Sequence, residues 1–102
     1  MYSALRNLAS TADEQLEYLA ALGLQDNIDE IALEFDDIFG AFMTDSTLSE
    51  AVRNDLQKIN ERLDEMSDRK DLWTPAALKS RQEWAEIRSI SRRVLDGLSV
   101  SK

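Results

Sequence analysis

Residues 47–67, TLSEAVRNDLQKINERLDEMS, carry the clearest folding signal in the chain. Apolar side chains recur there three or four residues apart, and nearly all positions between them are polar. This spacing predicts an amphipathic helix over about residues 48–67 with one buried stripe, since a half-buried strand would alternate every second residue. Thr47 and Glu50 fit a capping box at the helix start. The expected stripe is Leu48, Val52, Leu56, Ile59, Leu63 and Met66.

Three further segments with the same spacing flank this one, over about residues 3–22, 27–43 and 75–97. Glycine suits the residue after a helix, and this favours helix ends at Gly23 and near Gly97. Asp26 suits the cap of the second segment, and Thr74 followed by Pro75 suits the start of the fourth. Short connections between amphipathic helices predict an all-α, single-domain bundle of about four antiparallel helices over residues 1–102.

The fourth segment carries the largest candidate core residue. Trp84 lies in an apolar stripe with apolar neighbours one and two turns away, so we expect it in the core. Trp73 precedes the expected cap and is a candidate to pack on Leu78. A row of arginines lies beside the stripe, and we expect these side chains to pair with acids of a neighbouring helix. The row is Arg81, Arg88 and Arg92.

The composition excludes many kinds of catalysis. The chain has 102 residues without a cysteine or a histidine. Disulfides, thiolate nucleophiles and sulfur-ligated metals are therefore ruled out, and the usual general base near neutral pH is missing. No signal peptide or membrane-spanning run is apparent in the sequence, which favours the cytoplasm. We expect a protein that is not an enzyme and that uses no cofactor and no metal ion.

Charge is unevenly distributed along the chain. Residues 1–50 hold eleven acids and one base, a net charge of −10, whereas residues 51–102 hold nine acids and eleven bases, a net charge of +2. The whole chain therefore carries −8. Such a charge repels nucleic acid and anionic membranes and speeds association with a basic protein.

Acidic side chains crowd the second segment and form the candidate partner-binding site. A two-metal carboxylate centre would need histidines that the chain lacks, so a metal site is disfavoured. At 100° per residue, Leu33 falls among the carboxylates, which gives either an apolar anchor with an acidic rim or an ordinary solvated surface. Tyr18, on the flank of the first segment, is a secondary candidate. The acids are Asp26, Asp29, Glu30, Glu34, Asp36 and Asp37.

In its whole-chain character the sequence resembles the small acidic helical immunity proteins that bacteria make beside their toxins. The resemblance rests on size, acidity and two stretches, LWTPAAL at 72–78 and EWAEIR at 83–88. It implies a cytoplasmic inhibitor of a cognate toxin, with a nuclease as one candidate class, and it assigns no binding residues. A basic nuclease site would suit an acidic helical face. The alternative is a structural or adaptor bundle that docks another protein or forms a homodimer.

Overall fold

The computed structural model describes residues 3–24 and 27–100, and these contain six α-helices and one short 3₁₀ turn but no strand. The N-terminal half holds α1 (Ser3–Ala9), α2 (Ala12–Ala21) and α3 (Asp29–Thr44). The C-terminal half holds α4 (Glu50–Met66), η1 (Lys70–Leu72), α5 (Pro75–Ser80) and α6 (Gln82–Val100). The all-α prediction is confirmed, but the helices number six instead of four.

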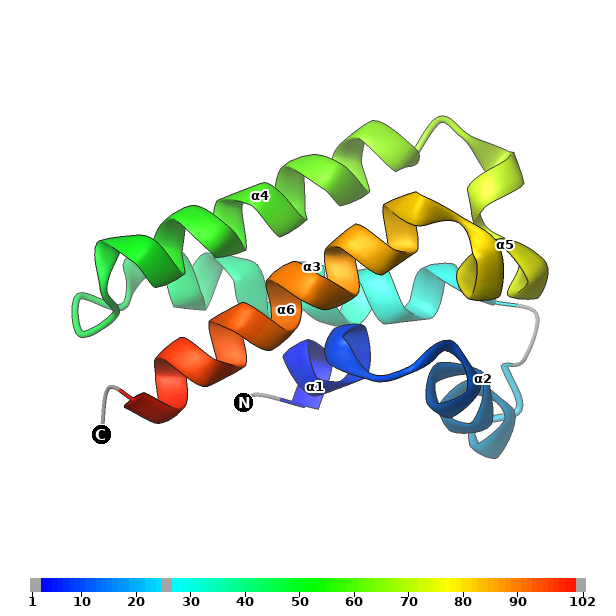
Figure 1. Cartoon of the computed structure of the whole chain (residues 1–102), viewed down its shortest axis with the longest axis horizontal. Helices are drawn as coiled ribbons and strands as arrows, with labels where there is room; N and C mark the ends of the chain where they lie inside the picture. Colours follow the sequence, from blue (N-terminus) through cyan, green and yellow to red (C-terminus); the bar gives the residue numbers. More distant parts are fainter. Residues whose placement is uncertain (1–2, 25–26, 101–102) are drawn as a thin grey trace.

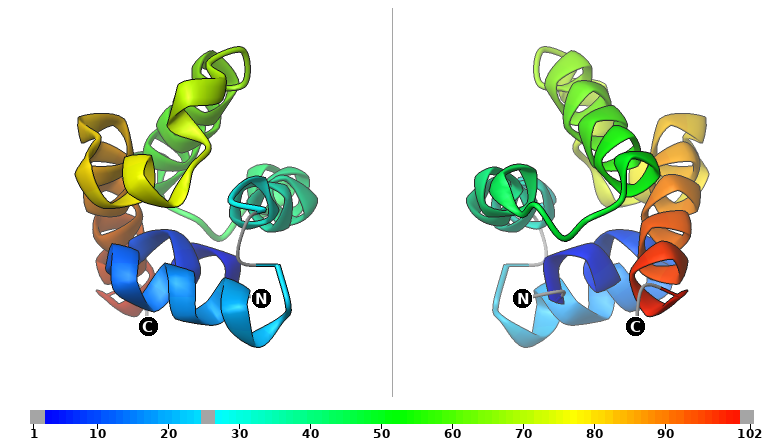
Figure 2. Two further views of the ribbon diagram at one scale, coloured as in Figure 1. Left: turned by 90° about the vertical axis from the view of Figure 1, so that its right-hand side faces the viewer. Right: turned by 90° about the vertical axis from the view of Figure 1, so that its left-hand side faces the viewer.

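The three long helices run antiparallel to their neighbours along the chain, and α1 completes the core (Figure 1). α6 packs on α4 and α1, while α3 packs on α1 and α4. α2 turns away from this group and packs against α5 and α1 (Figure 2). The arrangement therefore departs from a simple up-down bundle, because two expected helices are each divided in two, and α1 and α2, the pieces of the first, lie in different places.

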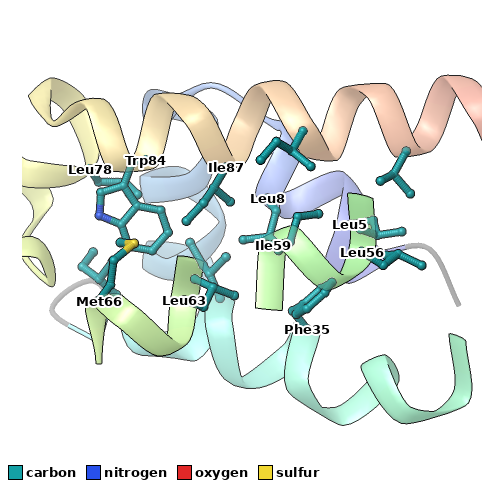
Figure 3. Packing of buried hydrophobic residues seen from close by; sticks show 14 of the residues in the cluster. Leu5, Leu8, Phe35, Leu56, Ile59, Leu63, Met66, Leu78, Trp84 and Ile87 are labelled. Carbon is teal, nitrogen blue, oxygen red and sulfur yellow. The ribbon is translucent and has the colours of Figure 1, made fainter. Parts of the chain in front are cut away.

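The buried apolar stripes meet in one continuous core (Figure 3). Trp84 is fully buried, as predicted, and its Nε1 donates a hydrogen bond of 2.7 Å to the Leu72 carbonyl. Trp73 packs edge-on against it, with ring centroids 5.3 Å apart. The stripe of α4 is buried at Val52, Leu56, Ile59, Leu63 and Met66.

Two helix starts follow from side-chain caps. The Thr74 hydroxyl accepts the Ala77 N–H, and Pro75 is the first helical residue, as predicted. The cap of α4 is Ser49, whose hydroxyl accepts the Val52 N–H, and the prediction of Thr47 is therefore wrong. Thr47 instead donates to the Asp45 carboxylate across the turn before the helix. Asp26, the predicted cap of α3, lies outside the described residues.

A helix end was predicted at two glycines, and the prediction is confirmed at Gly23 and wrong at Gly97. Gly23 follows α2 with a φ of 73°, the left-handed conformation expected after a helix. Gly97, by contrast, lies inside α6, which continues to Val100. A Cβ atom at this position would lie 2.8 Å from Cγ2 of Val52 on α4. Gly97 therefore lets the two helices approach closely instead of ending one of them.

Two arginines of α6 donate hydrogen bonds to carbonyl groups near the two breaks in the expected helices. The Nε atom of Arg92 donates to the carbonyl of Ala9, the last residue of α1, at 2.8 Å. Arg88 donates to the Leu78 carbonyl in α5 and to Oε1 of the buried Gln15 in α2. The expectation of ion pairs is met by Arg81, which pairs with Asp71 at 2.6 Å, but not by Arg88 or Arg92 within the described part of the chain.

Candidate functional site

A groove of about 570 Å³ lies between α3 and α4, at the end of the pair away from their connecting turn. The residues that follow α4, including Lys70 of η1, contribute to its lining. Its lining consists of Asp29, Ala32, Leu33, Phe35 and Asp36 from α3, and Asn60, Leu63, Asp64, Ser67, Lys70 and Trp73 from the other wall.

The groove combines an exposed leucine with a tryptophan that is held in place. Leu33 is 52% exposed, although most large apolar side chains of the described residues are buried. On the other wall, Trp73 donates its Nε1 hydrogen to the Met66 carbonyl at 2.8 Å. The polar atom of the indole is thus satisfied within the protein, and its ring is held against Trp84. A partner can therefore contact the indole of Trp73 without reordering it, which lowers the entropic cost of binding.

Carboxylates from both helices surround this apolar surface. Asp29 and Asp36 come from α3 and Asp64 from α4, and all three residues are exposed. Within residues 3–24 and 27–100, none of them has a basic partner within 4 Å. Lys70 is the basic residue of the lining, and it lies on η1. A cation placed beside an apolar anchor would therefore find unpaired acids here.

The predicted acidic face is divided by the structure into two sides. Leu33 shares the groove with Asp29 and Asp36, whereas Glu30, Glu34 and Asp37 are absent from its lining. The predicted Asp26 again lies outside the described residues. The sequence analysis placed Leu33 among all these acids. The structure shows which of them share a concave surface with it.

Glu34 is engaged inside the protein. Its carboxylate accepts a hydrogen bond of 3.0 Å from Nδ2 of Asn7 and another from the Tyr18 hydroxyl. The hydrogen bond to Glu34, then burial and the negative charge of Glu34, raise the pKa of Tyr18. Tyr18 is half-buried against the core. Through these bonds Glu34 of α3 is joined to Asn7 of α1 and to Tyr18 of α2. The Glu34 carboxylate and the Tyr18 hydroxyl therefore have partners within the protein.

Sequence reasoning missed the second wall of the groove. The sequence pattern places three of its residues on the polar side of a surface helix, where polar side chains are expected: Asn60, Asp64 and Ser67. Only the pairing of α3 with α4 brings them opposite Leu33, and no local pattern states which helices pair. The one sequence feature that could have indicated this wall is Trp73, a large apolar residue just outside a predicted helix.

Comparisons with known proteins add no family to this geometry. No protein-family model matches the chain, and neither a curated protein nor a solved structure is significantly similar to it. Among the described residues, no three acidic side chains are placed so that they could hold a metal ion. No helix of residues 3–24 and 27–100 has the length and apolar character needed to cross a bilayer. The function must therefore be argued from the groove itself.

Proposed function

We propose that this protein is a bacterial immunity protein that neutralises a basic cognate toxin, and that the groove between α3 and α4 is the surface that binds it. The observation that carries this proposal is the half-exposed Leu33 on the wall of a concave surface whose rim carries unpaired carboxylates. An apolar centre with a polar rim is the usual organisation of a protein-binding surface.

Charge complementarity supports a basic partner. The chain carries −8 overall, and the N-terminal half, which contains α3, carries −10. Such a field raises the rate of encounter with a positively charged protein and disfavours acidic ones. A nuclease holds phosphates with lysine and arginine side chains, so it is a toxin class that matches this surface. An acidic protein bound there would exclude the nucleic acid from the toxin.

An adaptor function is the second candidate, and the apolar lining favours it. Ala32, Leu63 and Trp73 would suit a helix of another protein, or a second copy of this chain, bound mainly by apolar contacts. The two functions differ in their response to salt. Screening slows the association of a basic toxin with an acidic face, whereas association through apolar contacts changes little.

Two adjacent aspartates of α3 allow a matched test. The partner to test is the protein encoded by the neighbouring reading frame. Asp36 lines the groove and Asp37 does not, although both are exposed on the same helix. We expect Asp36→Lys to slow association by about tenfold at low salt, since it places like charges against a basic partner, and Asp37→Lys to have a much smaller effect. Stopped-flow association at several salt concentrations measures both.

The competing results are distinct. A toxic neighbour that the parent chain fails to bind or to neutralise on co-expression would overturn the immunity function. Equal effects of the two substitutions would move the contact from the groove to the outer side of α3, where Glu30 and Asp37 lie. Association that does not respond to salt would favour the adaptor function. Circular dichroism of each variant confirms that it is folded.

A further inference from the structure

A second concave surface, of about 420 Å³, lies where α2, α5 and α6 meet, and its lining differs from that of the groove in every residue. Three basic side chains line it: Lys79 of α5 and Arg88 and Arg92 of α6. Thr11, the cap of α2, and the exposed Ser89 add hydroxyl groups, and Ala12 also lines the surface. Figure 2 shows the start of α2 beneath α5 and α6.

Both guanidinium groups are held in place by neutral acceptors. Arg88 donates from Nε and Nη2 to Oε1 of the buried Gln15, at 3.3 and 3.0 Å, and from Nη2 to the Leu78 carbonyl. Arg92 donates from Nε to the Ala9 carbonyl at 2.8 Å. These bonds fix the orientation of each group without neutralising its charge.

The remaining donors of these arginines are free among the described residues. Neither Nη1 of Arg88 nor either Nη atom of Arg92 has a hydrogen-bond partner there, and neither side chain lies within 4 Å of a carboxylate. The two residues are four apart on α6, so their charges repel each other. Burial, followed by the charge of Arg92, lowers the pKa of Arg88. An anion bound between them would relieve this repulsion.

Two acids lie near this surface and limit its positive charge. Asp13 approaches Lys79 at 3.9 Å, but both side chains are more than half exposed, so the pair contributes little. The Glu14 carboxylate accepts hydrogen bonds from the backbone and the hydroxyl of Thr11 in the capping box of α2. The first turn of that helix adds partial positive charge from its N–H groups.

We propose that this surface, which we call the basic hollow, is a binding site for a phosphate group. Arg92, whose two Nη atoms are free among the described residues, can bind phosphate oxygens with two parallel hydrogen bonds. The free Nη1 of Arg88 can donate a further hydrogen bond, and Lys79 adds a third positive charge from another helix. A tetrahedral dianion can meet three cations from different directions, whereas a carboxylate offers one plane and one charge. The proposal is independent of the toxin-binding function, because none of these residues lines the groove.

The test is a titration of the whole protein with inorganic phosphate, at constant ionic strength and neutral pH, followed by ¹H–¹⁵N NMR. We expect saturable shifts of the Nε–H signals of Arg88 and Arg92 and of the Thr11 and Ala12 amides. Lys79→Gln should raise the dissociation constant about three- to fivefold, the range of an exposed ionic contact. Asp13→Asn should lower the constant, because it removes the competing carboxylate.

Lys58→Gln is the matched control. Lys58 is exposed to the same degree as Lys79 and approaches its own aspartate, Asp55, at 4.0 Å, but it lies on α4 away from the basic hollow. This substitution should leave phosphate binding unchanged. An equal effect of both lysine substitutions, or shifts that never saturate, would show nonspecific screening and overturn the proposal. Acetate that bound as tightly as phosphate at the same signals would overturn the assignment to phosphate.

Discussion

Trp84 is the largest fully buried side chain of the core, and its indole nitrogen needs a hydrogen-bond partner there. Its indole lies between α4 and α6, near Met66, Leu78 and Ile87 (Figure 3). The hydrogen bond from Nε1 to the Leu72 carbonyl fixes η1 against the core. The apolar spacing of the sequence predicted that Trp84 is buried. It gave no sign of the Leu72 partner, because that contact depends on how the chain turns between α4 and α5.

Replacing Trp84 with alanine should lower the free energy of unfolding by about 3–5 kcal/mol, since it leaves a large cavity and an unpaired carbonyl. Trp84→Phe should cost less, because the ring fills part of the space while the Leu72 carbonyl stays unbonded. Urea unfolding followed by circular dichroism measures both variants. Losses below about 1 kcal/mol for Trp84→Ala would place this side chain at the surface.

Two helical glycines differ in what surrounds them. A Cβ atom at Gly40 of α3 would meet nothing within 4 Å, whereas one at Gly97 would lie 2.8 Å from Val52, which is almost fully buried. Gly40→Ala should therefore stabilise the protein by about 0.5–1 kcal/mol through its helix propensity. Gly97→Ala should destabilise it by about 1–3 kcal/mol, because the short valine side chain cannot easily move aside.

Thermal or urea unfolding of the two alanine variants checks this pair. Adding Val52→Ala to the Gly97 variant should recover the part of the loss that comes from the overlap, so the two substitutions should be far from additive. If Gly97→Ala stabilised the protein as much as Gly40→Ala, α4 and α6 would not approach as closely as described.

At the scale of the helices, the two breaks explain most of what the sequence analysis did not predict. The apolar spacing continues across Ser10 and Thr11, so it predicted one helix where α1 and α2 are separate. The signal was present in Thr11 and Glu14, which form the capping box that starts α2. The same pattern predicted a capping box at Thr47 and Glu50, which the structure does not use.

The break at Arg81 has a tertiary cause. No proline or glycine stands there, yet the residue is extended, with φ −87° and ψ 137°. In a straight helix Leu78 and Trp84 would point about 120° apart at 100° per residue. Both are fully buried in the structure, and the break lets each reach the core. Local spacing cannot show this, because it depends on where the other helices lie.

The contact of Tyr18 with Glu34 connects α2 to α3 and makes stability depend on pH. The hydrogen bond raises the pKa of Tyr18 above its unfolded value of about 10, so it favours the neutral phenol. This stabilisation is fully present below the unfolded pKa and is lost as the pH rises through the folded pKa. Tyr18→Phe should therefore be less stable than the parent at neutral pH, and the difference should shrink above about pH 10.

Urea unfolding of the parent and of Tyr18→Phe across this pH range measures the effect. Glu34→Gln is the control, since its amide oxygen can still accept the phenol hydrogen but carries no charge. A stability difference that stayed constant up to strongly alkaline pH would mean that the phenol does not bond to Glu34 in solution.

On the scale of the whole molecule, the fold sorts the two halves of the charge pattern onto different surfaces. The acidic α3 forms one wall of the groove, and the basic residues of α5 and α6 form the basic hollow. The sequence analysis placed Leu33, Asp29 and Asp36 in one candidate site because spacing on a single helix suffices for that, but this site also included Asp26, Glu30, Glu34, Asp37 and Tyr18. It could not identify the opposite wall or the basic hollow, because each needs residues that different helices bring together.

The measurement that tests the central claim most directly compares two equally exposed leucines. Leu33 lines the groove and is 52% exposed, and Leu22, at the end of α2, is 51% exposed but does not line it. The quantity to measure is the dissociation rate of the complex with the protein of the neighbouring reading frame, for Leu33→Asp and Leu22→Asp. Both variants should fold as the parent does, because each side chain is already in contact with water.

We predict that Leu33→Asp speeds dissociation by about tenfold or more, the loss of one buried leucine contact, while Leu22→Asp leaves the rate unchanged. Dissociation as slow as that of the parent for a folded Leu33→Asp would contradict the assignment of the groove between α3 and α4 as the binding surface.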